Sequence, residues 1–205
     1  MAKAILQPKP ADANTVALER HALGTLQYIR ASIEAAGMLA VPGSAGIALG
    51  TIGVCAALLV EHPALRSHWF PIWIAAGLTG LVSGTAMLVN QTRRTRAAIY
   101  RGPARKFLMC LCPALLAGAV LTVTLWQRHD MQLIPGVWLL LYGCAVAAAS
   151  TMTVRAVSVM GALFVALGIV ALQLPPHFSN IVLGIGFGGL HLAFGIIIGR
   201  VTHDR

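Results

Sequence analysis

His191 lies in the middle of a long run without charged side chains, in the stretch GFGGLHLAFG. An imidazole can donate or accept a hydrogen bond, carry a proton or ligate a metal. Polar side chains inside a membrane are costly, and they usually face protein and are paired. We therefore expect His191 to serve as an interhelical hydrogen-bonding residue or as part of a site for a ligand, quinone or proton. A third role would be ligation of a metal or haem.

Several polar side chains in other apolar stretches are candidate hydrogen-bond partners of this histidine: Thr79, Ser83, Thr85, Tyr142 and Ser150. If His191 instead binds a ligand, we expect Tyr142 and Ser83 to share the site. Haem held by two axial histidines would need a second intramembrane histidine. The remaining candidates fall in predicted loops or at helix edges: His62, His68, His129 and His177. The sequence therefore predicts no haem and no other cofactor.

The stretch CLCP at residues 110–113 is a second candidate for metal chemistry. Cys110 and Cys112 are two residues apart, so they point to opposite sides of a helix and cannot easily chelate one ion together. The loop histidines show no tight ligand spacing either. We predict no metal site, and we interpret the cysteines as small packing residues.

Catalytic constellations are missing from the apolar stretches. Their interiors contain no Asp, Glu, Lys or Arg, whereas ion-coupled transporters usually keep such a residue near the midplane. Membrane hydrolases need a nucleophile with a base, or paired carboxylates. Serines are present, but no motif connects one of them to His191. The sequence therefore predicts a protein that is not an enzyme.

The composition identifies the elements that must position these residues. Of the 205 residues, 58% are hydrophobic and only 10% are charged, whereas soluble domains have about 25% charged residues. The mean hydropathy is +0.79. The chain lacks the polar surface that a soluble fold needs, which indicates an integral membrane protein.

Five uncharged intervals are long enough to cross a bilayer, which takes about 20 apolar residues. The last interval is long enough for two crossings, and LPPHFSN at residues 174–180 separates them because prolines interrupt helices. We predict an all-α bundle of six spans within residues 36–205. The expected spans are about 43–60, 69–90, 107–126, 136–154, 156–174 and 180–199.

The positive charges predict the orientation. With the N-terminus inside, thirteen of the fifteen Lys and Arg residues fall on the cytoplasmic side, and only Arg66 and Arg128 fall outside. Cytoplasmic loops are enriched in these residues. We expect both termini in the cytoplasm, and the bacterial inner membrane as the location.

Two segments are expected to lie against the cytoplasmic leaflet. Residues 1–14 are expected to be flexible, and residues 15–35 to form an amphipathic interfacial helix; the alternative is a helix packed on the bundle or on another protein. The loop between the second and third spans carries six cations that attract anionic headgroups. These are Arg93, Arg94, Arg96, Arg101, Arg105 and Lys106. Membrane lipids are the expected partners, and nucleic acid is not.

Glycines four residues apart recur in three predicted spans: Gly46 and Gly50, Gly80 and Gly84, Gly184 and Gly188, and Gly195 and Gly199. Such pairs let another helix backbone approach closely. At about 100° per residue, His191 shares the glycine face of the sixth span.

Two functions fit these observations. The sequence favours a structural or regulatory bundle that associates with itself or with another membrane protein through glycine faces. The alternative is a small binding or transport protein for an uncharged or lipophilic ligand, with His191 at the site.

Overall fold

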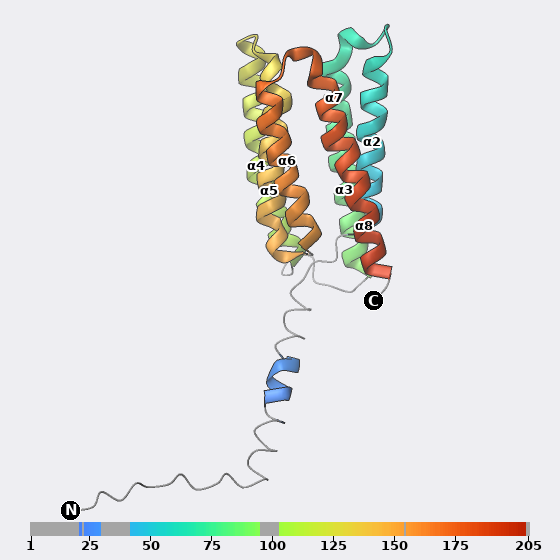
Figure 1. Ribbon diagram of the computed structural model, residues 1–205, viewed down its shortest axis with the longest axis vertical. Helices are drawn as coiled ribbons and strands as arrows, with labels where there is room; N and C mark the ends of the chain where they lie inside the picture. Colours follow the sequence, from blue (N-terminus) through green and yellow to red (C-terminus); the bar gives the residue numbers. More distant parts are fainter. Residues whose placement is uncertain (1–20, 22, 30–41, 95–102, 154, 204–205) are drawn as a thin grey trace, which may run out of the picture. The chain divides into compact units, whose positions relative to one another are not determined.

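The computed structural model describes residues 21, 23–29, 42–94, 103–153 and 155–203. Every element in these residues is a helix (Figure 1). The α-helices are α2 (Gly43–Glu61), α3 (Trp69–Arg94), α4 (Pro103–Gln127), α5 (Ile134–Ala149), α6 (Arg155–Gln173), α7 (Ser179–Leu183) and α8 (His191–His203). Short 3₁₀ turns are Arg66–His68, Met131–Leu133, Ser150–Met152 and Pro176–Phe178, and η5 (Gly184–Leu190) is a π-helix.

Within the described residues, six helical stretches are long and apolar enough to cross a membrane, in agreement with the predicted number of spans. The first three begin or end within a few residues of the prediction. The fourth ends earlier, because α5 stops at Ala149 and continues as a 3₁₀ turn. The sixth is not one regular α-helix, because α7, η5 and α8 follow one another without a break.

The prolines have different positions relative to the helices. As expected, Pro175 and Pro176 lie at the connection between α6 and α7, where Pro176–Phe178 forms a 3₁₀ turn. Pro113 lies inside α4, which continues on both sides of it.

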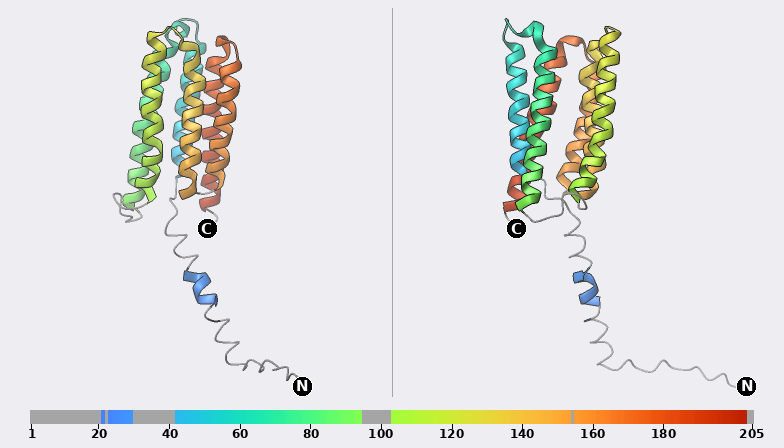
Figure 2. Two further views of the ribbon diagram at one scale, coloured as in Figure 1. Left: turned by 90° about the vertical axis from the view of Figure 1, so that its left-hand side faces the viewer. Right: turned by 180° about the vertical axis from the view of Figure 1, so that it is seen from behind.

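The spans form two groups of three, which Figures 1 and 2 show from different sides. In one group α2 packs between α3 and the α7–η5–α8 segment, and in the other α5 packs between α4 and α6. The α3 and α4 helices are the least buried spans. In an apolar 18-residue stretch of each, 11% of the residues are buried, against 44% in the last span.

Glycines allow the closest helix approach in each group. Along the antiparallel pair of α2 and α8, a Cβ atom added at Gly46 would lie 2.7 Å from the Gly195 Cα atom. Along the pair of α5 and α6, a Cβ added at Gly143 would lie 2.7 Å from the backbone nitrogen of Val165. Side chains at these positions would force the helices apart, so the glycines set the spacing of both pairs.

The two groups meet in an apolar core. Leu139 of α5 and Phe164 of α6 are fully buried, and they pack with Val182, Leu183 and Phe194 of the last span. This core fixes the faces of α5 and of the last span that point at each other.

The predicted interfacial helix is only partly described. Residues 23–29 are helical, and each of them is exposed within this segment taken by itself. Most of residues 15–35, and all of residues 1–14, lie outside the described residues. A position of this helix at a membrane surface therefore stays a prediction.

Candidate functional site

His191 and Tyr142 form a hydrogen-bonded pair between the two helix groups. The Tyr142 Oη atom lies 2.7 Å from the His191 Nε2 atom. His191 is the first residue of α8 and is 3% exposed, and Tyr142 lies in the middle of α5. A phenol and an imidazole can each donate or accept, so the distance fits either tautomer of the ring. Of the five expected partners, the structure brings Tyr142 to the histidine.

Aromatic rings enclose this pair. The Phe164 ring lies edge-on to the imidazole, with ring centroids 5.2 Å apart, and the Phe187 ring is stacked at 6.1 Å. The Tyr142 ring contacts the same two phenylalanines, at centroid distances of 5.0 and 5.3 Å. Edge-to-face and offset ring pairs of this kind stabilise a core beyond the area they bury. Rings from three elements, α5, α6 and η5, therefore surround the imidazole.

The second ring nitrogen of the histidine is not satisfied in the same way. His191 Nδ1 is buried and has no hydrogen-bond partner within the described part of the chain. The backbone carbonyl groups of Gly186 and Phe187 approach the imidazole from the preceding turn, but without regular hydrogen-bond geometry. An unsatisfied buried polar atom costs about 1–3 kcal/mol, so this nitrogen retains unused bonding capacity inside the bundle.

The π-helical segment η5 positions the histidine. Two of its glycines face close neighbours: a Cβ at Gly186 would overlap Leu139 Cδ2, and one at Gly188 would lie 2.9 Å from Val54 Cγ2. Glycines are therefore required where α5 and α2 press against the segment. Short π-helical turns inside α-helices often occur at functional sites.

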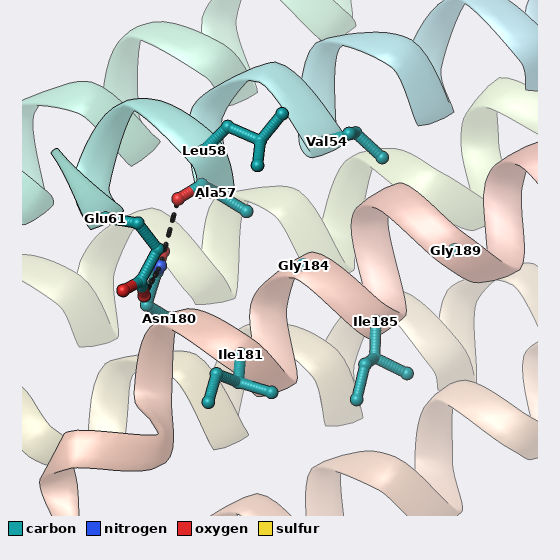
Figure 3. A pocket seen from close by; sticks show the side chains of 9 residues that line it. All are labelled: Val54, Ala57, Leu58, Glu61, Asn180, Ile181, Gly184, Ile185 and Gly189. Atoms are coloured by element: carbon teal, nitrogen blue, oxygen red, sulfur yellow. Dashed lines mark hydrogen bonds between the residues drawn. The ribbon is translucent and has the colours of Figure 1, made fainter.

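An open groove of about 400 Å³ runs between α2 and the α7–η5 segment (Figure 3). Ala57 and Gly184 approach closely along it, since a Cβ on Gly184 would lie 3.0 Å from the Ala57 Cβ. Leu58 on one side and Ile181 and Ile185 on the other are at least half exposed. The lining residues are Val54, Ala57, Leu58, Glu61, Asn180, Ile181, Gly184, Ile185 and Gly189.

One end of the groove carries a polar cluster, which we call the Glu61 cluster and which consists of Glu61, Asn180, Trp73 and Arg66. Asn180 Nδ2 donates to Glu61 Oε1 at 2.7 Å and to the carbonyl oxygen of Ala57 at 3.0 Å (Figure 3). Asn180 Oδ1 accepts a hydrogen bond from Trp73 Nε1 at 3.1 Å. The amide thus joins α2, α3 and α7, and it fixes one oxygen of the Glu61 carboxylate.

Arg66 completes this cluster on its exposed side. The guanidinium Nη2 atom lies 3.5 Å from Glu61 Oε2, longer than the roughly 2.7–2.9 Å of a charge-assisted hydrogen bond. The Arg66 and Glu61 side chains are 70% and 54% exposed. The second carboxylate oxygen therefore keeps hydrogen-bonding capacity for a molecule that lies in the groove.

The predicted site residues separate in the structure. His191 and Tyr142 come together, whereas Ser83 bonds to the carbonyl oxygens of Thr79 and Gly80 in its own helix. Among the described residues, no hydrogen bond joins Ser83 to the pair. The sequence analysis missed the Glu61 cluster altogether. A glutamate at the end of one span and an asparagine at the start of another were the available signal, but nothing in the sequence connected them.

The predicted packing glycines lie mainly in contacts inside the chain. Gly46, Gly50, Gly188 and Gly195 lie between α2 and the last span, and Gly184 faces Ala57. Cβ atoms on Gly80 and Gly84 would face Leu49, at 3.2 and 3.7 Å, and one on Gly199 would meet nothing within 4 Å.

The cations of the loop between α3 and α4 are described only in part. Arg93 and Arg105 are exposed, nothing is described of the Arg94 and Lys106 side chains, and Arg96 and Arg101 lie outside the described residues.

All four cysteines are free. Across the described ranges, no group of three His, Cys, Asp or Glu side chains is arranged to hold a metal ion.

No protein-family model, curated protein or solved structure matches this chain. We therefore infer its function from its own residues and their geometry.

Proposed function

We propose that this chain is a multi-pass membrane protein without enzymatic activity that binds a lipophilic molecule in the groove between α2 and the α7–η5 segment. The observation that carries this proposal is the groove itself. It combines an apolar lining with one end formed by a polar cluster. Small-molecule sites share this combination of apolar walls and a few placed polar groups, in volumes of about 300–1,000 Å³.

The groove lies on helices that are expected to contact lipid. Leu58, Ile181 and Ile185 are 67%, 50% and 50% exposed, so an apolar chain lying between them would cover them. In the orientation expected from the loop charges, the Glu61 cluster lies at the outer membrane interface. A ligand would then place its apolar part toward the membrane centre and its polar part at the interface.

We place the ligand in the groove and not at His191, because the imidazole is enclosed by aromatic rings and its Nε2 is already bonded to Tyr142. The histidine supports the site indirectly. It anchors the C-terminal end of η5, and η5 contributes Gly184, Ile185 and Gly189 to the groove.

Association through glycine faces, which the sequence favoured, has less support. The closest-packed glycines of α2 and the last span face each other within one chain, so they are not free for a second copy. A homo-oligomer would have to use other surfaces, such as those of the little-buried helices α3 and α4.

Substituting Gly189 tests the proposal. Gly189 lines the groove and a Cβ there would meet nothing within 4 Å, so we expect Gly189→Leu to place its side chain in the groove. Gly77 of α3 is equally open but does not line the groove, which makes Gly77→Leu the matched control. We expect delipidated protein to bind a first dioleoyl phosphatidylcholine about tenfold more weakly in the Gly189→Leu variant.

Native mass spectrometry of lipid titrations gives both the affinity and the protein stoichiometry. Equal affinities for wild type and both variants would refute the groove as the binding site. A stable dimer of the wild type and of both variants would instead support a bundle that associates with itself.

A further inference from the structure

We propose that the Glu61 cluster selects a membrane phospholipid whose headgroup carries a primary ammonium next to its phosphate. This inference rests on the proposed function, since it names the headgroup of the lipid whose chain lies in the groove. The juxtaposition that carries it is a fixed carboxylate and a nearby guanidinium at the end of an apolar groove.

Glu61 supplies the negative half of the match, and it is the only charged residue among those lining the groove. Asn180 orients the carboxylate by holding Oε1 at 2.7 Å, and Trp73 in turn orients Asn180. Among the described residues, the second oxygen, Oε2, has the 3.5 Å ion pair with Arg66 and no hydrogen bond. A primary ammonium has three N–H donors, so it can bond to this oxygen directly.

Arg66 supplies the positive half. A phosphoethanolamine headgroup carries an ammonium that two carbon atoms separate from its phosphate. Glu61 and Arg66 carry the opposite charges, and their side-chain atoms lie 3.5 Å apart. Guanidinium groups match phosphate oxygens well. At a membrane interface such pairs are less screened by water than in bulk solvent, which favours a complementary arrangement.

The apolar part of the groove restricts the occupant to a lipid. A free amine or a soluble phosphate ester would gain nothing from Leu58, Ile181 and Ile185, whose exposed side chains lie along the groove. Phosphatidylcholine has the same phosphate and tails, but its quaternary ammonium has no N–H donor. Phosphatidylglycerol has no cation at all. These three lipids therefore separate the contributions of charge and of hydrogen bonding.

The test measures binding of the first lipid to delipidated full-length protein, with dioleoyl tails on all three lipids. We expect phosphatidylethanolamine to bind about tenfold more tightly than phosphatidylcholine, the size of one charge-assisted hydrogen bond. Glu61→Gln keeps an oxygen for Asn180 but removes the charge, and it should reduce this preference to within about twofold. Asp130→Asn removes a carboxylate from the α4–α5 turn instead, and it should leave the preference unchanged.

Arg66→Gln separates the two halves of the proposed match. Because both lipids contain a phosphate, this change should weaken both and keep the preference for the ammonium. Glycerophosphoethanolamine, which has the headgroup without tails, should compete poorly.

Three outcomes would overturn the inference: no preference in the wild type, a preference that survives Glu61→Gln, or equal competition by glycerophosphoethanolamine. The proposed function fails separately. If lipids bind without headgroup preference but Gly189→Leu still weakens them, the groove is a binding site and only the headgroup assignment is wrong.

Discussion

Removing the hydroxyl of Tyr142 should destabilise the bundle, and removing both polar partners should restore most of the loss. In Tyr142→Phe the ring contacts with Phe164 and Phe187 remain, but His191 would lose its hydrogen bond at Nε2. Its Nδ1 already has no partner within the described residues. Interhelical hydrogen bonds in membranes contribute about 0.6 kcal/mol on average and about 1.7 at most. In this variant both nitrogens of the imidazole would be unsatisfied, so the cost should lie at the upper end of this range. We expect the free energy of unfolding to fall by about 1–2 kcal/mol.

A double variant tests whether Tyr142 and His191 contribute to stability as one unit. His191→Phe alone keeps a ring among the other rings but leaves the buried Tyr142 hydroxyl unsatisfied, for a similar loss of about 1–2 kcal/mol. Tyr142→Phe combined with His191→Phe leaves no unpaired polar atom, and replacing both partners by apolar groups of similar shape can be nearly neutral. We therefore expect the double variant to lose about 1 kcal/mol or less, well below the sum of the single losses.

The free energy of unfolding can be measured by titrating purified protein in mild micelles with dodecyl sulfate and following the helical circular dichroism signal. Ser83→Ala is the control, because that hydroxyl bonds only to carbonyl groups of its own helix in the described structure. It should change stability by about 0.5 kcal/mol or less. If the double variant loses the sum of the two single losses, within about 0.5 kcal/mol, the pair is not an energetic unit and the reasoning is wrong.

The remaining predictions concern packing and orientation. Gly195→Ala should lower the free energy of unfolding by about 1–3 kcal/mol, because the added Cβ would lie 2.6 Å from the backbone nitrogen of Ile47. Gly77→Ala is the control and should be neutral or stabilising by up to about 1 kcal/mol. Equal effects of the two changes in the unfolding titration would contradict the contact between α2 and α8. A periplasm-active phosphatase fused after Arg205 should be inactive and a fluorescent protein at the same place bright, because thirteen of fifteen cations lie on the expected cytoplasmic side. An active phosphatase would reverse the predicted orientation.

The sequence predicted the six spans well because the relevant signal is local. Whether a segment enters a membrane depends on the summed transfer energies of about 20 neighbouring residues. Charged residues bounded the segments, and the two prolines at 175 and 176 marked the break in the longest one. The ends were less accurate: α5 stops at Ala149 where the span was expected to reach residue 154, because a 3₁₀ turn replaces the last α-helical turn.

The environment of His191 was predicted in part. Its shared face with the glycines indicated a position toward protein, and the side chain is 3% exposed. The angle predicted between Gly184 and His191 was that of a regular α-helix. The structure has a π-helix at η5, and its wider turns change the register between these two residues. The sequence offered five hydrogen-bond partners and could not rank them, because each was polar, uncharged and inside an apolar stretch.

The amino-acid sequence was sufficient to predict an apolar helical membrane protein with six spans and a central histidine that faces protein. Charge, hydropathy and proline positions are properties of single segments, so they can be interpreted without knowing which helices meet. The pairing of Tyr142 with His191 and of Asn180 with Glu61 became evident from the packing of the helices. Those pairs are 49 and 119 residues apart in the chain. They depend on which helices pack together, and that choice is made by close backbone contacts at glycines such as Gly46 and Gly195, whose partners the sequence does not specify.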